Sequence, residues 1–102
     1  MKTTKKDWLR INNILRSRNI AHDQTKHINC FRFHPTESKA HRDEKFRICS
    51  NLYDRGHPFL CEVWTADRKR RFDILDLEDD VVIEIETNFN VDKGDMVKTV
   101  RI

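Results

Sequence analysis

The sequence predicts an α+β domain in which a helix packs on a mostly antiparallel meander of three to four strands. Apolar residues recur at helical spacing over residues 39–55 and form short runs at 58–65, 70–77 and 81–87. Turn-forming stretches separate these runs, as expected of hairpins. A helix followed by consecutive strands favours the α+β class. We expect a single domain over residues 1–102, a length that suits one small core.

A further helix is expected within residues 1–20. Trp8, Ile11 and Leu15 fall on one helical face, and Asp7 is placed to cap the first turn. This segment would be an amphipathic N-terminal helix.

The ends of the longer helix carry recognisable signals. Ser38 predicts its N-cap, and Gly56 predicts the left-handed residue that ends it. Residues 19–33 and 88–102 show no clear pattern, so their role is left open.

Composition excludes several classes of protein. No apolar run approaches the roughly 18 residues of a membrane span, and the basic N-terminus lacks the apolar core of a signal peptide. The three cysteines have irregular spacing, which does not suit a secreted disulfide framework. We therefore expect an intracellular protein with no membrane partner.

Charge is unevenly distributed along the chain. Residues 1–71 contain 17 basic and 8 acidic residues, whereas residues 72–102 contain 3 and 9. A basic shell around an acidic strand pair suits a polyanion that needs a cation at one point. A solvated surface with scattered charges explains the same numbers.

Asp73, Glu84 and Glu86 lie inside the two strands predicted at 70–77 and 81–87. Pairing of these strands through the acidic turn would bring Asp73 and Glu84 together on one face. Two ionised carboxylates in an apolar setting repel, so a proton or a cation must lie between them. Mg²⁺ or Mn²⁺ suits such oxygen ligands. The alternative is a hairpin whose acidic face lies in solvent.

Strict alternation also assigns the neighbours of these acids. It places Asp73 and Leu75 on one face of their strand, opposite Phe72 and Ile74.

The order of a helix, a strand, "FDIL" and "VVIEIE" resembles the PD-(D/E)xK nuclease superfamily, which includes restriction endonucleases and archaeal Holliday-junction resolvases. The resemblance implies that Asp73 and Glu84 hold a magnesium ion. It implies that an acid on the preceding helix assists, with Glu44 the best candidate and His41 its rival. Glu86 stands where the superfamily has its lysine.

The stretch from residue 34 to 87 also resembles small nuclease-like proteins of archaea and their viruses, which share a helix with His and Lys, a Glu at the end of the first strand and an E-x-E third strand. For a viral protein, the location implied is the host cytoplasm. Glu86 could act as a third ligand, and Lys45 or Lys69 could replace the missing lysine. Otherwise the domain would only bind nucleic acid.

Basic residues provide candidate contacts to DNA. Lys45 and the run Arg68, Lys69, Arg70 and Arg71 could follow a phosphate backbone. The alternative for the run is a charged hairpin tip.

A zinc site is a weaker candidate. His27, Cys30 and His34 have ligand spacing, but no paired Cys-x-x-Cys accompanies them. A strand and turn would place the same residues without a metal.

The function that we expect is Mg²⁺- or Mn²⁺-dependent cleavage of DNA phosphodiester bonds, at branched or structured sites, by a homodimer. Glu44, Asp73, Glu84 and Glu86 are the expected catalytic residues. The rivals are an inactive nuclease-fold module that binds nucleic acid and a Zn²⁺-stabilised interaction domain.

Overall fold

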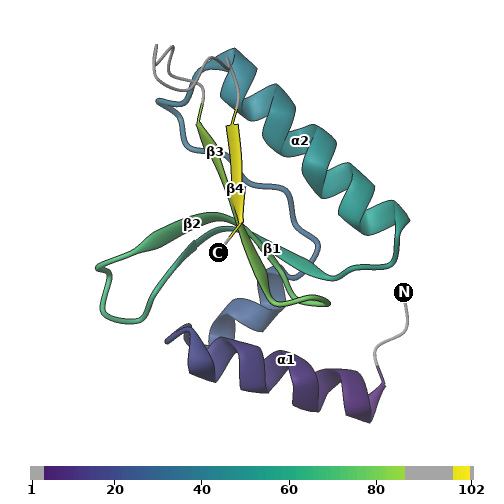
Figure 1. Cartoon of the computed structure of the whole chain (residues 1–102). Helices are drawn as coiled ribbons and strands as arrows, with labels where there is room; N and C mark the ends of the chain where they lie inside the picture. The colour runs from purple at the N-terminus through teal and green to yellow at the C-terminus, as the bar shows by residue number, and fades with distance from the viewer. Residues whose placement is uncertain (1–3, 87–97, 102) are drawn as a thin grey trace.

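The structure of the chain, a computed structural model, describes residues 4–86 and 98–101. It contains two α-helices, one 3-10 helix and one sheet (Figure 1). In chain order the elements are α1 (Lys5–Ser17), η1 (His22–His27), α2 (Lys39–Asp54), β1 (Phe59–Trp64), β2 (Arg71–Asp76), β3 (Val81–Glu86) and β4 (Lys98–Arg101).

The sheet has the strand order β1-β2-β3-β4, and each strand is antiparallel to its neighbour. The predicted α+β class, the two helices and the meander are confirmed. The fourth strand comes from the tail that the sequence left open. None of the helices in the described part of the chain has the length and apolarity needed to cross a membrane.

Capping residues define where both helices begin. Thr4, not Asp7, is the N-cap of α1: its hydroxyl accepts the Asp7 N–H at 3.1 Å, and the Asp7 carboxylate accepts the Thr4 N–H at 3.1 Å. The expected cap was therefore wrong by three residues, because Asp7 is the second partner of a capping box. Ser38 caps α2 as predicted. Gly56 follows α2 with a φ of +74°, the left-handed conformation predicted for it.

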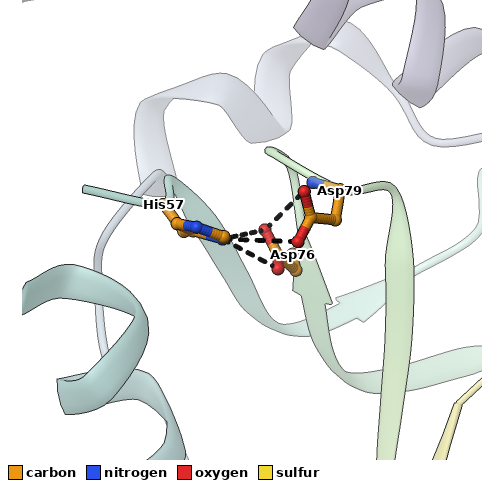
Figure 2. Close-up of side chains that lie close together, drawn as sticks. All are labelled: His57, Asp76 and Asp79. Atoms are coloured by element: carbon orange, nitrogen blue, oxygen red, sulfur yellow. Dashed lines mark hydrogen bonds and ion pairs between the residues drawn. The ribbon is translucent and has the colours of Figure 1, made fainter. Parts of the chain in front are cut away.

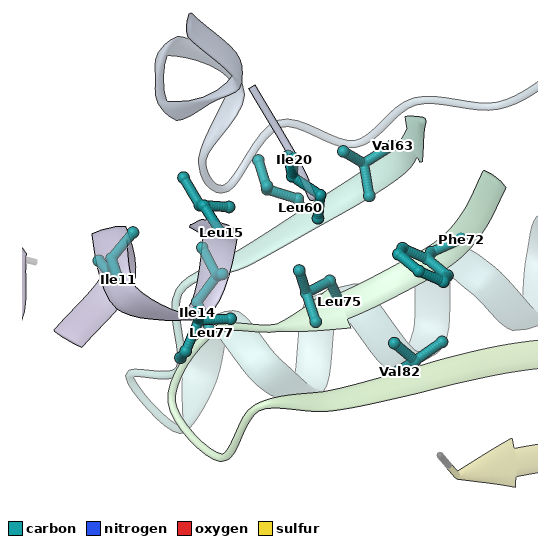
Figure 3. Close-up of a cluster of buried hydrophobic side chains, with 10 residues drawn as sticks. All are labelled: Ile11, Ile14, Leu15, Ile20, Leu60, Val63, Phe72, Leu75, Leu77 and Val82. Atoms are coloured by element: carbon teal, nitrogen blue, oxygen red, sulfur yellow. The ribbon is translucent and has the colours of Figure 1, made fainter. Parts of the chain in front are cut away.

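Two apolar clusters lie on opposite faces of the sheet. The one beneath α1 is drawn in Figure 3, and its buried members are Ile11, Ile14, Leu15, Ile20, Leu60, Val63, Phe72, Leu75, Leu77 and Val82. The one beneath α2 comprises Cys49, Leu52, Phe59, Cys61, Ile74, Ile83 and Ile85. The strands β1, β2 and β3 are therefore covered on both sides, which explains why they read as nearly continuous apolar runs.

Alternation of side chains breaks at one point on two neighbouring strands. Cys61 belongs to the α2 cluster, but Val63, two residues later, belongs to the α1 cluster. Phe72 and Ile74 on β2 are divided in the same way. Residues two apart on a regular strand share a face, so the strict alternation expected for β2 is wrong.

The break lies at the pair formed by Glu62 and Asp73. The register joins Cys61 to Ile74 and Val63 to Phe72, which places Glu62 opposite Asp73. Glu62 has a φ of +54°, in the left-handed region that strands do not normally enter. We call this pair the face switch, because on each strand the residue before it and the residue after it point to opposite faces of the sheet.

The segment between α1 and α2 runs beside the outer edge of β1. Asn29 donates its N–H to the Phe59 carbonyl at 2.9 Å, and its side-chain oxygen accepts the Phe59 N–H at 3.2 Å. The Arg32 guanidinium donates to the Glu62 carbonyl at 2.8 Å. Residues 19–33 therefore cover a strand edge that would otherwise be exposed.

We predict that Leu15→Ala lowers the free energy of unfolding by about 3 kcal/mol, because Leu15 is almost fully buried and its truncation leaves a cavity. Leu9→Ala is the matched control on the same helix. Leu9 is 64% exposed, so its truncation should change stability by less than about 0.5 kcal/mol. Urea denaturation measures both, and equal losses would contradict the placement of α1 on the sheet.

Candidate functional site

Charged side chains gather at the face switch, most of them on the side of the sheet that α2 covers. We call this group the charged cluster, and its members are Glu37, His41, Lys45, Glu62, Arg71, Asp73 and Glu84. They come from the turn before α2, from α2 itself and from the three strands β1, β2 and β3. Charged groups are rarely buried without partners, so their contacts define what this region can do.

Lys45 is at the centre of the cluster and has no exposed surface. Its ammonium donates to Glu37 Oε1 at 2.7 Å, to Glu62 Oε1 at 2.5 Å and to the Arg32 carbonyl at 3.4 Å. Burial lowers the pKa of Lys45, but the hydrogen bonds from the two carboxylates outweigh it, and the pKa ends above its usual value. The ammonium is therefore charged, with three acceptors for its three protons.

Glu62 lies between the buried Lys45 and the partly exposed Arg71, which marks the solvent-facing mouth of the cluster. Its second carboxylate oxygen accepts from the Arg71 guanidinium at 2.7 Å. Its left-handed backbone turns the side chain toward α2, where a regular strand would turn it away. Such a backbone costs on the order of 1–3 kcal/mol in a non-glycine residue. The two ion pairs of Glu62 offset this cost.

Asp73 is also buried, with 4% of its surface exposed. One carboxylate oxygen accepts the backbone N–H of Ile85 at 2.9 Å. The other lies 3.7 Å from His41 Nε2 and 3.9 Å from Arg71 Nη2. The pairing of β2 with β3 ends at Ile74, so the Ile85 N–H bonds the Asp73 side chain in place of a backbone carbonyl of β2.

His41 lies between two carboxylates. Its Nε2 is 3.1 Å from Glu37 Oε2 and 3.7 Å from Asp73 Oδ1. The same nitrogen is buried and has no hydrogen bond of good geometry to any described residue. It is therefore a buried polar atom beside two carboxylates without a well-formed bond to either.

Glu84 lies half-buried on β3. Burial, followed by the negative charge of Asp73 and a hydrogen bond with it, raises the pKa of Glu84 to about 7. Asp73 and Glu84 therefore approach each other as expected, and without a cation between them the ionised form of Glu84 is disfavoured. Asp73 points toward α2 as expected. Ile83 and Ile85, the neighbours of Glu84 on β3, pack under α2, so alternation directs the Glu84 side chain away from α2, and the expectation that the two acids share one face is not met.

Other expected site residues lie elsewhere. Glu44 bonds Arg47 on the outer side of α2, with Arg47 Nε 2.8 Å from Glu44 Oε1. The expectation that Glu44 supports Asp73 is therefore wrong, and its rival His41 occupies that position because it is one turn nearer the N-terminus of α2. The side chain of Glu86 lies outside the described residues.

The structure separates the residues expected to contact DNA. Lys45 is fully buried, so its assignment as a DNA contact is wrong: its ammonium is bound to carboxylates inside the cluster. Arg68, Lys69 and Arg70 are exposed in the turn between β1 and β2. Arg71 lies at the mouth of the charged cluster, with 34% of its side chain exposed.

The structure does not assemble the expected zinc ligands. Within the described ranges, the one group of three metal-ligating side chains with their donor atoms close together is His57, Asp76 and Asp79. Cys30 is exposed and donates to the Ile28 carbonyl, and His34 bonds Thr36. The zinc site on His27, Cys30 and His34 is therefore not formed in this structure.

Two members of the cluster, Glu37 and Glu62, were not among the expected site residues. Glu37, His41 and Lys45 follow one another at intervals of four, the spacing of one helical face. Glu62 is the one acid in a run of apolar residues on β1. Both signals were readable, but neither shows that the groups converge on Lys45.

In comparisons with protein-family models, with curated proteins and with solved structures, no family, sequence or structure matches this chain.

We predict that the stability of the metal-free protein falls between about pH 5 and about pH 8, in part because of Glu84. The folded state binds the Glu84 proton up to about pH 7, above the ordinary value of 4.5. Its stabilising contribution is therefore complete below about pH 4.5 and disappears as the pH rises through about 7. In the presence of a chelator, the urea midpoint should fall less with rising pH for Glu84→Gln than for the unmodified protein. Glu44→Gln is the control and should retain the full decline.

We also predict that Lys45→Met destabilises the fold by about 3–5 kcal/mol at neutral pH, since it removes the buried cation that bonds Glu37 and leaves Arg71 as the one basic partner of Glu62. Lys39→Met is the matched control on the same helix, because the Lys39 side chain is 78% exposed and pairs with Asp43 at the surface. It should cost less than about 1 kcal/mol. Thermal or urea unfolding measures both, and similar values for the two variants would contradict the buried position of Lys45.

Proposed function

We propose that this chain is a nuclease that hydrolyses phosphodiester bonds of DNA with the help of Mg²⁺ or Mn²⁺. The observation that carries the proposal is the arrangement of Asp73 and Glu84, two adjacent acids on neighbouring strands, beside His41 and the buried Lys45. The resemblance to PD-(D/E)xK nucleases suggested the same two acids as metal ligands.

The donor set of the cluster fits a divalent cation. Four carboxyl groups face two permanent cations, Lys45 and Arg71, which leaves two negative charges uncompensated when all four acids are ionised. Lys45 bonds Glu37 and Glu62, and Arg71 bonds Glu62, so these two cations compensate these two acids and the excess falls on Asp73 and Glu84. These offer hard oxygen ligands, which Mg²⁺ and Mn²⁺ prefer.

A metal bound by Asp73 and Glu84 would polarise the phosphate and lower the pKa of a bound water. The protein residues divide the remaining tasks. Lys45 fixes Glu37 and Glu62, and is therefore a positioning residue.

His41 Nε2 lies between Glu37 and Asp73, where it can hold or pass on a proton. Arg71, partly exposed at the mouth, is placed to meet a phosphate oxygen.

Exposed groups beside the cluster suit nucleic acid. Phe33 and Phe46 are 49% and 57% exposed, and the Arg42 guanidinium lies 5.4 Å from the centre of the Phe33 ring. Arg42 and Phe46 each follow a cluster residue in the sequence of α2, so this surface adjoins the proposed site. Aromatic faces and arginine can stack on unpaired bases. Arg68 to Arg70, in the β1–β2 turn, add phosphate contacts.

A second candidate is a nucleic-acid-binding module without catalysis. It is favoured by Lys45, whose three protons are already bonded inside the cluster, and by Glu86, which stands where the superfamily has lysine. Without a free lysine, the attacking water has fewer groups to activate it. The nuclease and the binding module would share the metal ligands, and only the nuclease would cleave DNA.

The test for the metal is the substitution Asp73→Asn. Mn²⁺ should raise the melting temperature of the unmodified protein, because an ion that binds only the folded state stabilises it. The variant should lose this rise and all cleavage of a labelled DNA panel of single-stranded, duplex and branched forms. Asp67→Asn, an exposed acid in the β1–β2 turn, is the control and should retain both. A rise without cleavage would support the binding module, and no rise would contradict the proposed site.

The DNA surface is tested by changing Arg68, Lys69 and Arg70 together to glutamine. Affinity should fall, and the slope of log affinity against log salt should decrease by about one for each phosphate that the protein no longer neutralises. Fluorescence anisotropy with labelled DNA measures both quantities.

The matched control changes Lys5, Lys6 and Arg16 on α1 to glutamine and removes the same amount of charge. It should leave the salt slope nearly unchanged. If the α1 variant loses affinity and the turn variant does not, the nucleic acid binds across α1.

A further inference from the structure

A second group of metal-ligating side chains lies at the other end of β2. Figure 2 shows His57, Asp76 and Asp79 converging on one point. The ring nitrogen Nδ1 of His57 lies 3.1 Å from Asp76 Oδ2 and 3.8 Å from Asp79 Oδ2. The three donor atoms all lie within 4.8 Å of one another.

The fold brings these residues together through backbone contacts. His57 follows the glycine that ends α2, Asp76 is the last residue of β2, and Asp79 lies in the β2–β3 turn. Leu77 donates its N–H to the Pro58 carbonyl at 2.8 Å, which joins the start of β1 to the end of β2. The three side chains are therefore held by main-chain pairing.

We propose that His57, Asp76 and Asp79 form a binding site for a divalent transition-metal ion, zinc being the best fit. Ligands at about 2.0–2.1 Å from a tetrahedral Zn²⁺ are separated by about 3.3 Å, and the two measured separations from His57 Nδ1 lie on either side of that value. One imidazole with two carboxylates is a donor set that Zn²⁺ accepts and that Mg²⁺, which prefers oxygen alone, does not favour.

The charges of His57, Asp76 and Asp79 also favour a divalent cation. Asp76 is 5% exposed, and its Oδ1 accepts the backbone N–H of Glu78 at 2.9 Å. Within residues 4–86, neither Asp76 nor Asp79 has a lysine or arginine at ion-pair distance. Backbone donors serve one oxygen of Asp76, and a cation would compensate the charge that remains. Two carboxylates and a neutral imidazole match the charge of a divalent ion.

The site has room for a fourth ligand. Asp76 and Asp79 line a cavity of about 400 Å³ between α2 and the β2–β3 turn, whose opposite wall includes Asn51 and Arg55. Three protein ligands with one position open to a cavity is the arrangement of zinc sites that bind a water or an anion. Arg55 would favour an anionic fourth ligand.

This site is separate from the one proposed for nuclease activity. Asp76 is three residues along β2 from Asp73, about 10 Å at the rise of a strand. Metal ions that act together on one phosphate lie about 3.5–4 Å apart. The proposal therefore does not depend on the charged cluster or on catalysis.

The experiment uses Zn²⁺ alone with the full chain, after treatment with a chelator. Zn²⁺ should raise the melting temperature, and elemental analysis after gel filtration should find one zinc per chain. Asp79→Asn removes one exposed ligand with little risk to the fold, since 59% of its side chain is exposed. It should weaken Zn²⁺ binding by more than about tenfold.

Two control variants make the outcome decisive. Asp54→Asn changes an exposed acid at the end of α2 and should bind Zn²⁺ as the unmodified chain does. Asp73→Asn should also retain Zn²⁺ while losing the effect of Mn²⁺, which separates failure of this site from failure of the nuclease site. Absence of zinc binding in the unmodified chain, or full binding by Asp79→Asn, would overturn the proposal.

Discussion

The pairing of Glu62 with Asp73 is the constraint on which the arrangement of the molecule depends. At this pair the alternation of side chains on β1 and β2 breaks, so residues two apart across it pack into different apolar clusters. Both acids are directed toward α2, the same side as their sequence neighbours Cys61 and Ile74, whereas successive residues of a regular strand point to opposite faces. The left-handed backbone of Glu62 is the local cost of that change.

Lys45 compensates the buried charge at the face switch. A buried ion pair seldom stabilises more than a well-packed apolar substitute, because both charges lose their hydration. Lys45 therefore contributes mainly by specifying one geometry: it requires Glu37 from the turn before α2 and Glu62 from β1 at the same place. The position of α2 on the sheet and the positions of Glu37 and Glu62 are thus fixed by the same contacts.

Much of the fold could be predicted from the sequence. Ser38 and Gly56 marked the ends of α2, and the apolar runs marked three strands, because caps and periodicity are local properties. Asp73 and Glu84 could be named as candidates for a similar reason, since acids inside apolar strands stand out. The convergence of other groups depends on tertiary contacts.

Other features could not be predicted because they depend on three-dimensional geometry. Strict alternation failed at Asp73, since nothing in the sequence marks a left-handed residue at Glu62. The choice of Glu44 over His41 was wrong because it depended on the rotation of α2 about its axis. Lys45 was assigned to the surface because lysine is usually exposed, and its burial follows from two carboxylates distant in sequence.

The contacts of residues 19–33 with β1 restrict how the sheet can be extended. A strand of another molecule that approached β1 would have to displace the Asn29 bonds to Phe59 and the Arg32 bond to Glu62. Addition of a strand at this edge is thereby opposed, so β1 would remain at an outer boundary of any larger sheet that the chain joins.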